Sequence, residues 1–163
     1  MGTSSVLMLP YTASSVGVAR RRLIGDLSEA GVFETTACDA GLVLSELISN
    51  ALRHATPLAG CVVRVAWWLD DDYLEIAVSD GGGPTVPVVN QPGHTAIGGR
   101  GLGIVDRLAL RWGVCPPPDG GAGETTVWAE LALSPDRADE HSDAGCSVDQ
   151  QPRRLVITSS RDA

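Results

Sequence analysis

The order of apolar and polar residues predicts three helices and five strands within the first 133 residues. The helices are expected at residues 14–30, 36–54 and 101–110. In the first helix, Ser14 or Ser15 can cap the start, Gly31 ends it, and the inward positions are Val16, Ala19, Leu23, Leu27 and Ala30. The strands are expected at residues 6–9, 61–69, 73–80, 111–115 and 125–133.

Alternation within the strands assigns side chains to the two faces of a sheet. Asp70-Asp71-Asp72 predicts the turn of a hairpin, and one face of its second strand carries Leu74, Ile76 and Val78. Asp80 continues that face, so it should emerge at the strand end beneath the helices, where a buried carboxylate needs a partner. The alternative is a turn aspartate that helps to form the bend at residues 81–83. In the last strand, Thr125 and Val127 share the inward face.

Two segments have no helix or strand pattern. Residues 84–99, rich in Pro, Gly, Asn, Gln and Thr, fit a mobile flap better than a simple connection. From residue 134 onwards the sequence is mostly acidic, basic and small polar residues, apart from Leu155-Val156-Ile157. The expected organisation is therefore one domain at residues 1–133 and a disordered polar tail at residues 134–163.

Composition and charge exclude several classes of protein. The 163 residues are 44% hydrophobic and 20% charged, with neither a stretch of membrane-spanning length nor a signal sequence, so we expect a cytoplasmic protein that does not bind membranes. A net charge of −8 argues against direct nucleic-acid binding. All twelve basic residues are arginine, which excludes a P-loop because that motif needs lysine. Cys38 and Cys61 fall in helix or strand patterns and are expected to be buried thiols, neither disulfide-bonded nor bound to zinc.

One face of the second helix carries candidate chemistry. Glu46, Asn50 and His54 are four residues apart and therefore share a face, opposite an apolar stripe. A carboxylate one turn from a carboxamide suits a magnesium nucleotide, since the acid can orient a hydroxyl and the amide oxygen can bind the metal. The alternative is the polar side of a surface helix.

Two glycine-rich segments could complete such a site. In Asp80-Gly81-Gly82-Gly83, the glycines let a flat ring approach the backbone while the carboxylate accepts its exocyclic amine. Residues 98–104, with the sequence GGRGLGI, open the third helix, whose free amides and dipole can hold phosphates.

Together and in this order, the three segments resemble the GHKL (Bergerat-fold) ATP-binding domains, most closely the bacterial anti-sigma-factor serine/threonine kinases. Residues 46–51 are similar to the N box, Asp80-x-Gly82 to the G1 box, and residues 99–103 to the G2 box. Thr125-Thr126-Val127 resembles the final strand, whose threonine lies near adenine. The resemblance implies an α+β fold: a two-layer sandwich with a mixed, mostly antiparallel sheet and helices on one face.

The resemblance also implies roles for individual residues. Glu46 would be the general base, Asn50 the Mg²⁺ ligand, and Asp80 the adenine anchor, with ATP as cofactor. The other implied ATP-binding residues are Arg53, Gly82, Arg100, Gly101, Leu102, Gly103 and Thr125. Proline at position 84 and Glu124 replace glycines common in the family, and these departures bear on phosphotransfer more than on nucleotide binding.

The leading functional hypothesis is a kinase that phosphorylates an anti-sigma-factor antagonist and sequesters a sigma factor. The alternative is a catalytically weak or inactive module whose ATP-dependent conformation sets its affinity for a partner protein. The catalytic half of a histidine kinase is disfavoured, because no histidine stands in a dimerisation-helix context. Trp67 and Trp68 point to opposite faces, which leaves a homodimer interface open.

Overall fold

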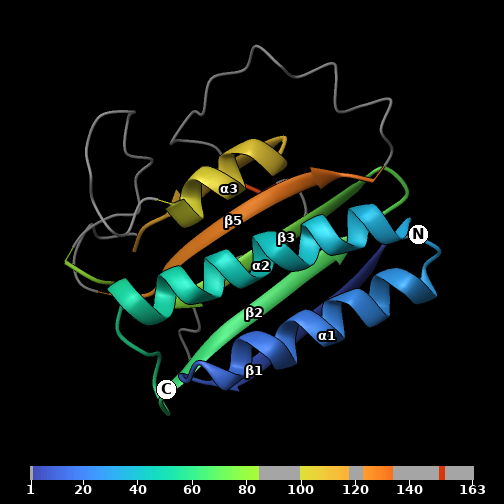
Figure 1. Cartoon of the computed structure of the whole chain (residues 1–163). Coiled ribbons are helices and arrows are strands. Elements are labelled where there is room, and N and C mark those ends of the chain that lie inside the picture. Colours follow the sequence, from blue (N-terminus) through green and yellow to red (C-terminus); the bar gives the residue numbers. More distant parts are fainter. Residues whose placement is uncertain (1, 85–99, 118–122, 134–150, 153–163) are drawn as a thin grey trace.

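Five antiparallel strands form one sheet, and three helices cover one of its faces (Figure 1). The computed structural model describes residues 2–84, 100–117, 123–133 and 151–152, and these counts refer to that part of the chain. The strands are β1 (Thr3–Pro10), β2 (Val62–Leu69), β3 (Tyr73–Asp80), β4 (Arg111–Cys115) and β5 (Thr125–Ala132). The helices are α1 (Ser14–Glu29), α2 (Glu34–His54) and α3 (Arg100–Leu108).

The strand order is β1-β2-β3-β5-β4, so β3, which ends in Asp80, lies at the centre of the sheet. Every strand pair in the described residues is antiparallel. The two-layer α+β fold expected from the sequence is thus confirmed, with no parallel pair among the described strands.

The sheet register confirms how side chains were assigned to faces. Val65 lies opposite Val78, and Val78 lies opposite Val127, so these side chains share the helix-covered face. All three are buried, together with Leu23 of α1 and Leu47 of α2. Burial of this continuous apolar layer is the main force holding helices and sheet together.

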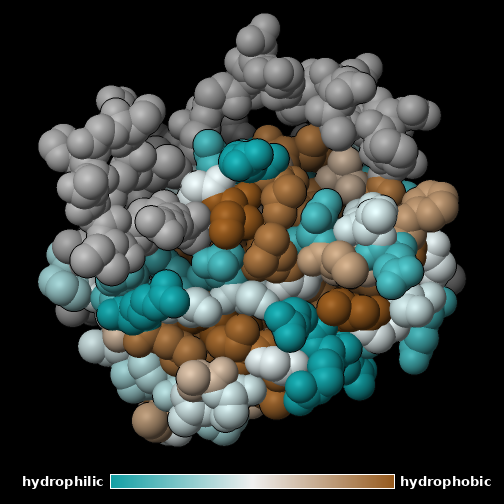
Figure 2. Space-filling view, viewed as in Figure 1, coloured by the Kyte–Doolittle hydropathy of each residue, from teal (hydrophilic) through white to brown (hydrophobic). Residues whose placement is uncertain are grey.

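The first two helices cross closely because Gly41 of α2 has no side chain. A Cβ at this position would lie 3.2 Å from Cγ of Arg20 and 3.2 Å from Cδ1 of Ile24. Figure 2 shows apolar surface in two bands, one between α1 and α2 and one beside α2 on the side of α3. Apolar residues thus border α2 on both sides of this surface.

Three local expectations were wrong. The N-cap of α1 is Ala13, since the hydroxyl of Ser15 donates to the carbonyl of Pro10 at 2.6 Å and does not cap the helix. Ala30 is exposed because the helix ends at Glu29. Cys61 precedes β2 in a turn, with φ of 58°, and both Cys61 and Cys38 are exposed thiols.

Some predictions fall outside the described residues. The predicted flap lies there from residue 85 to residue 99, as does the predicted tail except for residues 151–152. The division at residue 133 therefore stays a prediction. Among the described helices, none has the length and apolar character needed to cross a membrane.

Candidate functional site

Helix α2 presents its candidate residues beside the apolar layer. Its buried positions include Val43, Leu47 and Ala51, which fix the rotation of the helix on the sheet. Glu46 and Asn50 are half-buried as a result, whereas the last turn exposes Arg53 and His54. The helix thus has the dry face and the polar face that its spacing predicts.

Asp80 ends the central strand and is buried, with 4% of its surface exposed. It lies opposite Thr125 in the register of β3 and β5, on the helix-covered face. The pKa of this carboxyl group is raised to about 6: burial raises it most, the hydrogen bond from Gly82 lowers it, and the negative charge of Glu124 raises it. A carboxyl group kept this dry is well suited to bind a polar ligand.

The carboxylate of Asp80 also shapes its own turn. Its Oδ1 accepts the backbone N–H of Gly82 at 2.7 Å, which is the turn role weighed as the alternative. This is the only hydrogen bond that the described residues make to the carboxylate. The turn role and a ligand role are compatible, because the second carboxylate oxygen can accept a further donor.

The glycines after Asp80 pack against the chain that leaves α2. Gly81 N–H donates to the carbonyl of Thr56 at 2.8 Å, and Thr56 N–H donates to the carbonyl of Gly82 at 2.8 Å. A Cβ on Gly81 would lie 2.5 Å from the carbonyl oxygen of Pro57, and one on Gly82 would lie 2.5 Å from that of Gly123. Gly82 also has φ of +81°, which side chains rarely adopt. These glycines therefore fix the distance between β3, the end of α2 and the start of β5.

Tyr11 holds the other side of the end of α2, a role the sequence analysis missed. Its hydroxyl lies 2.5 Å from the carbonyl oxygen of Ala51 and 2.7 Å from that of Ala55, and it donates its single proton to one of them at a time. Burial raises the pKa of this hydroxyl, and the charge of Asp80 adds to the rise. Tyr11 stands between a strand and a helix in the sequence, and no local pattern signals a contact 40 residues away.

The described part of the third candidate segment, from residue 100 onwards, lies at the start of α3, which packs against α2. Arg100 and Gly101 are its first two residues. Leu102 is buried in the core, so any contact it makes with a ligand would come from its backbone. A Cβ on Gly103 would meet no atom of the described residues within 4 Å. The N–H groups of this first turn lack partners within the helix and can hold an anion.

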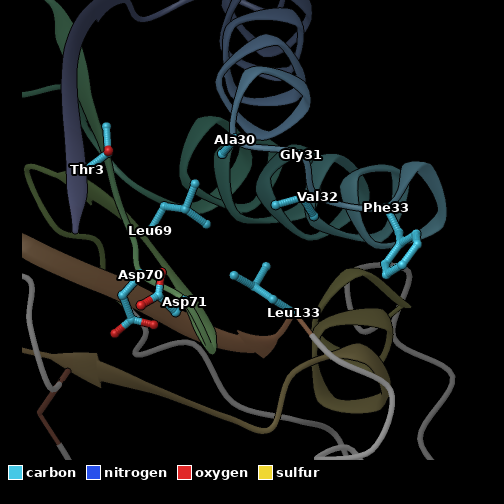
Figure 3. Close-up of a pocket in the computed structure, with 9 residues that line it drawn as sticks. All are labelled: Thr3, Ala30, Gly31, Val32, Phe33, Leu69, Asp70, Asp71 and Leu133. Carbon is cyan, nitrogen blue, oxygen red and sulfur yellow. The ribbon is translucent and has the colours of Figure 1, made fainter. Parts of the chain in front are cut away.

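A separate cavity of about 380 Å³ lies at the end of the sheet opposite to Asp80 (Figure 3). It is lined by Leu69, Leu133 and Phe33 among others, and Asp70 and Asp71 stand at its side. Oδ1 of Asp70 accepts the N–H groups of Asp72 and Tyr73, as expected of a hairpin turn. No cluster of metal-binding side chains occurs in the described residues. This cavity is not the candidate site, because Asp80 is at the other end of β3.

Comparison with known proteins identifies the family of this chain. A family model described as histidine kinase-like ATPase domain matches residues 9–122, a range that includes α2, Asp80 and the start of α3. The chain therefore belongs to the histidine kinase-like ATPase domain family.

A solved structure supports the fold in more detail. The RsbU and RsbW domains of Rv1364c from Mycobacterium tuberculosis match with a TM-score of 0.59 and 21% sequence identity. The match covers 80% of this chain and 33% of that chain, so this protein spans about a third of the length of the solved one. No curated protein matches the sequence.

Proposed function

We propose that this chain is an ATP-dependent serine/threonine kinase that phosphorylates an anti-sigma-factor antagonist and, in alternation, sequesters a sigma factor. The observation that carries the proposal is Asp80, a buried carboxyl group at the end of the central strand, opposite Thr125 and tied through Thr56 to the helix of Glu46 and Asn50. The RsbW domain of the solved neighbour supports the anti-sigma-factor assignment.

In this proposal the base and the phosphates of ATP contact different elements. The second oxygen of Asp80 accepts the exocyclic amine of adenine, Thr125 lies beside the ring, and Gly82 lets the ring approach. The phosphates are held by the backbone amides of Gly101, Leu102 and Gly103, with Arg53 and Arg100 as cations. Mg²⁺ bound at the oxygen of Asn50 supplies charge neutralisation for the phosphates.

Glu46 is the proposed general base. Its half-buried carboxylate lies one helical turn before Asn50, on the polar side of α2. It receives the proton of the attacking serine or threonine hydroxyl, so its action requires the hydroxyl and the phosphate to be held in line. A cytoplasmic location follows from this proposal, because sigma factors act there.

The test uses γ-labelled ATP, Mg²⁺ and purified antagonist proteins. Glu46→Gln should reduce label transfer by about 100-fold or more while leaving ATP affinity within about threefold. Glu34→Gln is the matched control, since Glu34 is an exposed carboxylate in the first turn of the same helix. Normal transfer by Glu46→Gln would exclude Glu46 as the base.

The same experiment separates the second candidate function. Pro84 stiffens the chain just after the glycines that border Asp80, a feature that suits a binding module better than a fast enzyme. ATP binding without transfer to any antagonist would identify the chain as an ATP-dependent binding module. Absence of ATP binding would contradict both functions.

A further inference from the structure

A polar cluster lies on the helix-free face of the sheet, directly behind the pair Asp80–Thr125. Nη2 of Arg64 donates to Oγ of Ser79 at 3.2 Å, and the same atom forms an ion pair with Glu124. Oγ of Ser79 lies 2.6 Å from Oγ1 of Thr126. Ser79 and Thr126 adjoin Asp80 and Thr125 in the sequence, and alternation places their side chains on the opposite face.

This cluster neutralises the negative charge of Glu124 through the ion pair with Arg64. The carboxylate of Glu124 stands next to Thr125, where its negative charge disfavours the ionised form of Asp80. The side chains of Arg64 and Glu124 are only 18% and 21% exposed, so water screens their charges incompletely. Arg64 of β2, which is 60 residues away in the sequence, contacts this acid and neutralises its charge.

Among the titratable groups around Asp80, Glu124 is the one whose negative charge raises the pKa of Asp80. The hydroxyl of Tyr11 is engaged with the carbonyl oxygens of α2 and stays neutral at physiological pH, because burial and Asp80 both raise its pKa. His54 is exposed at the end of α2. The thiol of Cys61 is exposed, and it also raises the pKa of Tyr11.

We propose that Arg64 is a positioning residue for the nucleotide site: its ion pair holds the carboxylate of Glu124 on the helix-free face and keeps that charge from weakening nucleotide binding at Asp80. This inference rests on the proposed ATP site and adds a residue on the opposite face of the sheet to it. Arg64 itself does not touch the nucleotide.

The experiment is a double-mutant cycle on binding of a fluorescent ATP analogue with Mg²⁺ between pH 5.5 and 8.5. Arg64→Met should weaken binding about five- to tenfold at pH 7 and move the acid limb of the binding curve to higher pH. Glu124→Gln alone should bind as tightly as wild type or more tightly. The double variant Arg64→Met/Glu124→Gln should return to within about twofold of wild type.

The double variant distinguishes the loss of charge neutralisation from the loss of the other contacts of Arg64. Both Arg64→Met variants lose the hydrogen bond to Ser79, so recovery in the double variant shows that the charge of Glu124 caused the loss. Arg22→Met is the matched control, because Arg22 is also ion-paired, to Asp26 at 3.1 Å, but belongs to the middle of α1. It should bind within about twofold of wild type.

Other outcomes overturn the inference. Wild-type binding by Arg64→Met, or weak binding by the double variant, would exclude an electrostatic role for Arg64. If Arg64→Met fails to fold, as judged by circular dichroism, weaker binding by Glu124→Gln than by wild type overturns the inference on its own. Absence of binding by the wild type would instead reject the proposed function, and this inference with it.

Discussion

The buried carboxylate of Asp80 lowers the stability of the ligand-free protein but suits ligand binding. The carboxyl group is buried at the end of β3, and its pKa is raised from 3.8 to about 6, chiefly by burial. At neutral pH the group is nonetheless mostly ionised, so the folded protein carries a charge that would be better solvated in the unfolded chain. Residues that cost stability without ligand are typical of binding sites, because the ligand supplies the missing partner.

We therefore expect Asp80→Asn to stabilise the ligand-free protein and to abolish ATP binding. Because the folded pKa lies above the unfolded value, the wild type loses stability as pH rises from about 4 to about 6, and the loss is complete above that range. The variant lacks this loss, so its free energy of unfolding should exceed that of wild type by about 1–3 kcal/mol at pH 7.5 and by much less at pH 4. Urea unfolding at both pH values measures the difference.

The matched control for this substitution is Asp39→Asn, which changes an exposed carboxylate on α2. It should leave both the stability difference between the two pH values and ATP affinity close to wild type. A variant Asp80→Asn that is less stable than wild type at pH 7.5 would show that the carboxylate stabilises the turn more than its burial costs. Unchanged ATP affinity would mean that Asp80 is not the adenine anchor.

At the scale of elements, the glycines at residues 81–83 join β3 to the end of α2. Gly81 bonds to Thr56 through its N–H, and the carbonyl of Pro57 occupies the space of a side chain at this position. The position of α2 along the sheet, and with it that of Glu46 and Asn50, depends on this close approach. A larger residue must therefore move one element relative to the other.

We expect Gly81→Ala to lower the free energy of unfolding by about 1–3 kcal/mol and to weaken ATP binding, because its Cβ would lie 2.5 Å from a backbone oxygen. Gly25→Ala is the control, since Gly25 lies within α1 and a Cβ there meets nothing within 4 Å. It should stabilise the protein by up to about 1 kcal/mol. Urea unfolding followed by tryptophan fluorescence compares them, and equal stability of Gly81→Ala and wild type would contradict the packing argument.

The elements themselves were largely predictable because each has a local period. Strands β3 and β4 have the predicted bounds, and α2 begins two residues before the expected position. Alternation also predicted that Asp80 and Thr125 share the helix-covered face, and the register pairs them directly. Errors arose where a single local contact decides the outcome, as at Ser15, whose hydroxyl bonds to Pro10 and leaves the helix uncapped.

The contacts that support the candidate site were not predictable from periodicity. Tyr11 meets the end of α2, and Arg64 meets Glu124, only after the sheet has brought distant segments together. A strand pattern shows which face a side chain occupies but not which residue of a non-adjacent segment it meets. The roles of Glu46 and Asn50 remain predictions for a related reason: a role toward a nucleotide depends on a ligand that a sequence pattern does not place.

At the scale of the whole molecule, the sheet offers several surfaces besides the candidate site: its opposite end, its helix-free face and the edge formed by β1. The candidate site lies at the end of β3, whereas the cavity beside Phe33 lies at the opposite end (Figure 3). The helix-free face carries the buried carboxylate of Glu130, which Arg111 binds through two nitrogens at 3.1 and 2.9 Å. At one edge, β1 is paired on a single side within the described sheet. These surfaces indicate where a second molecule can bind without covering the site.

We expect two copies of the chain to associate through β1. An edge strand offers unpaired backbone groups, and β1 also exposes Val6 and Met8, at 61% and 55% of their surface, on the helix-free face. A twofold interface would bring the two copies of Val6 close together, so Val6→Asp would place like charges in an apolar contact.

Val18→Asp is the control, since Val18 is an exposed valine on α1. Light scattering after gel filtration should give dimers for wild type and Val18→Asp and monomers for Val6→Asp. Monomeric wild type, or dimeric Val6→Asp, would exclude this edge as the interface.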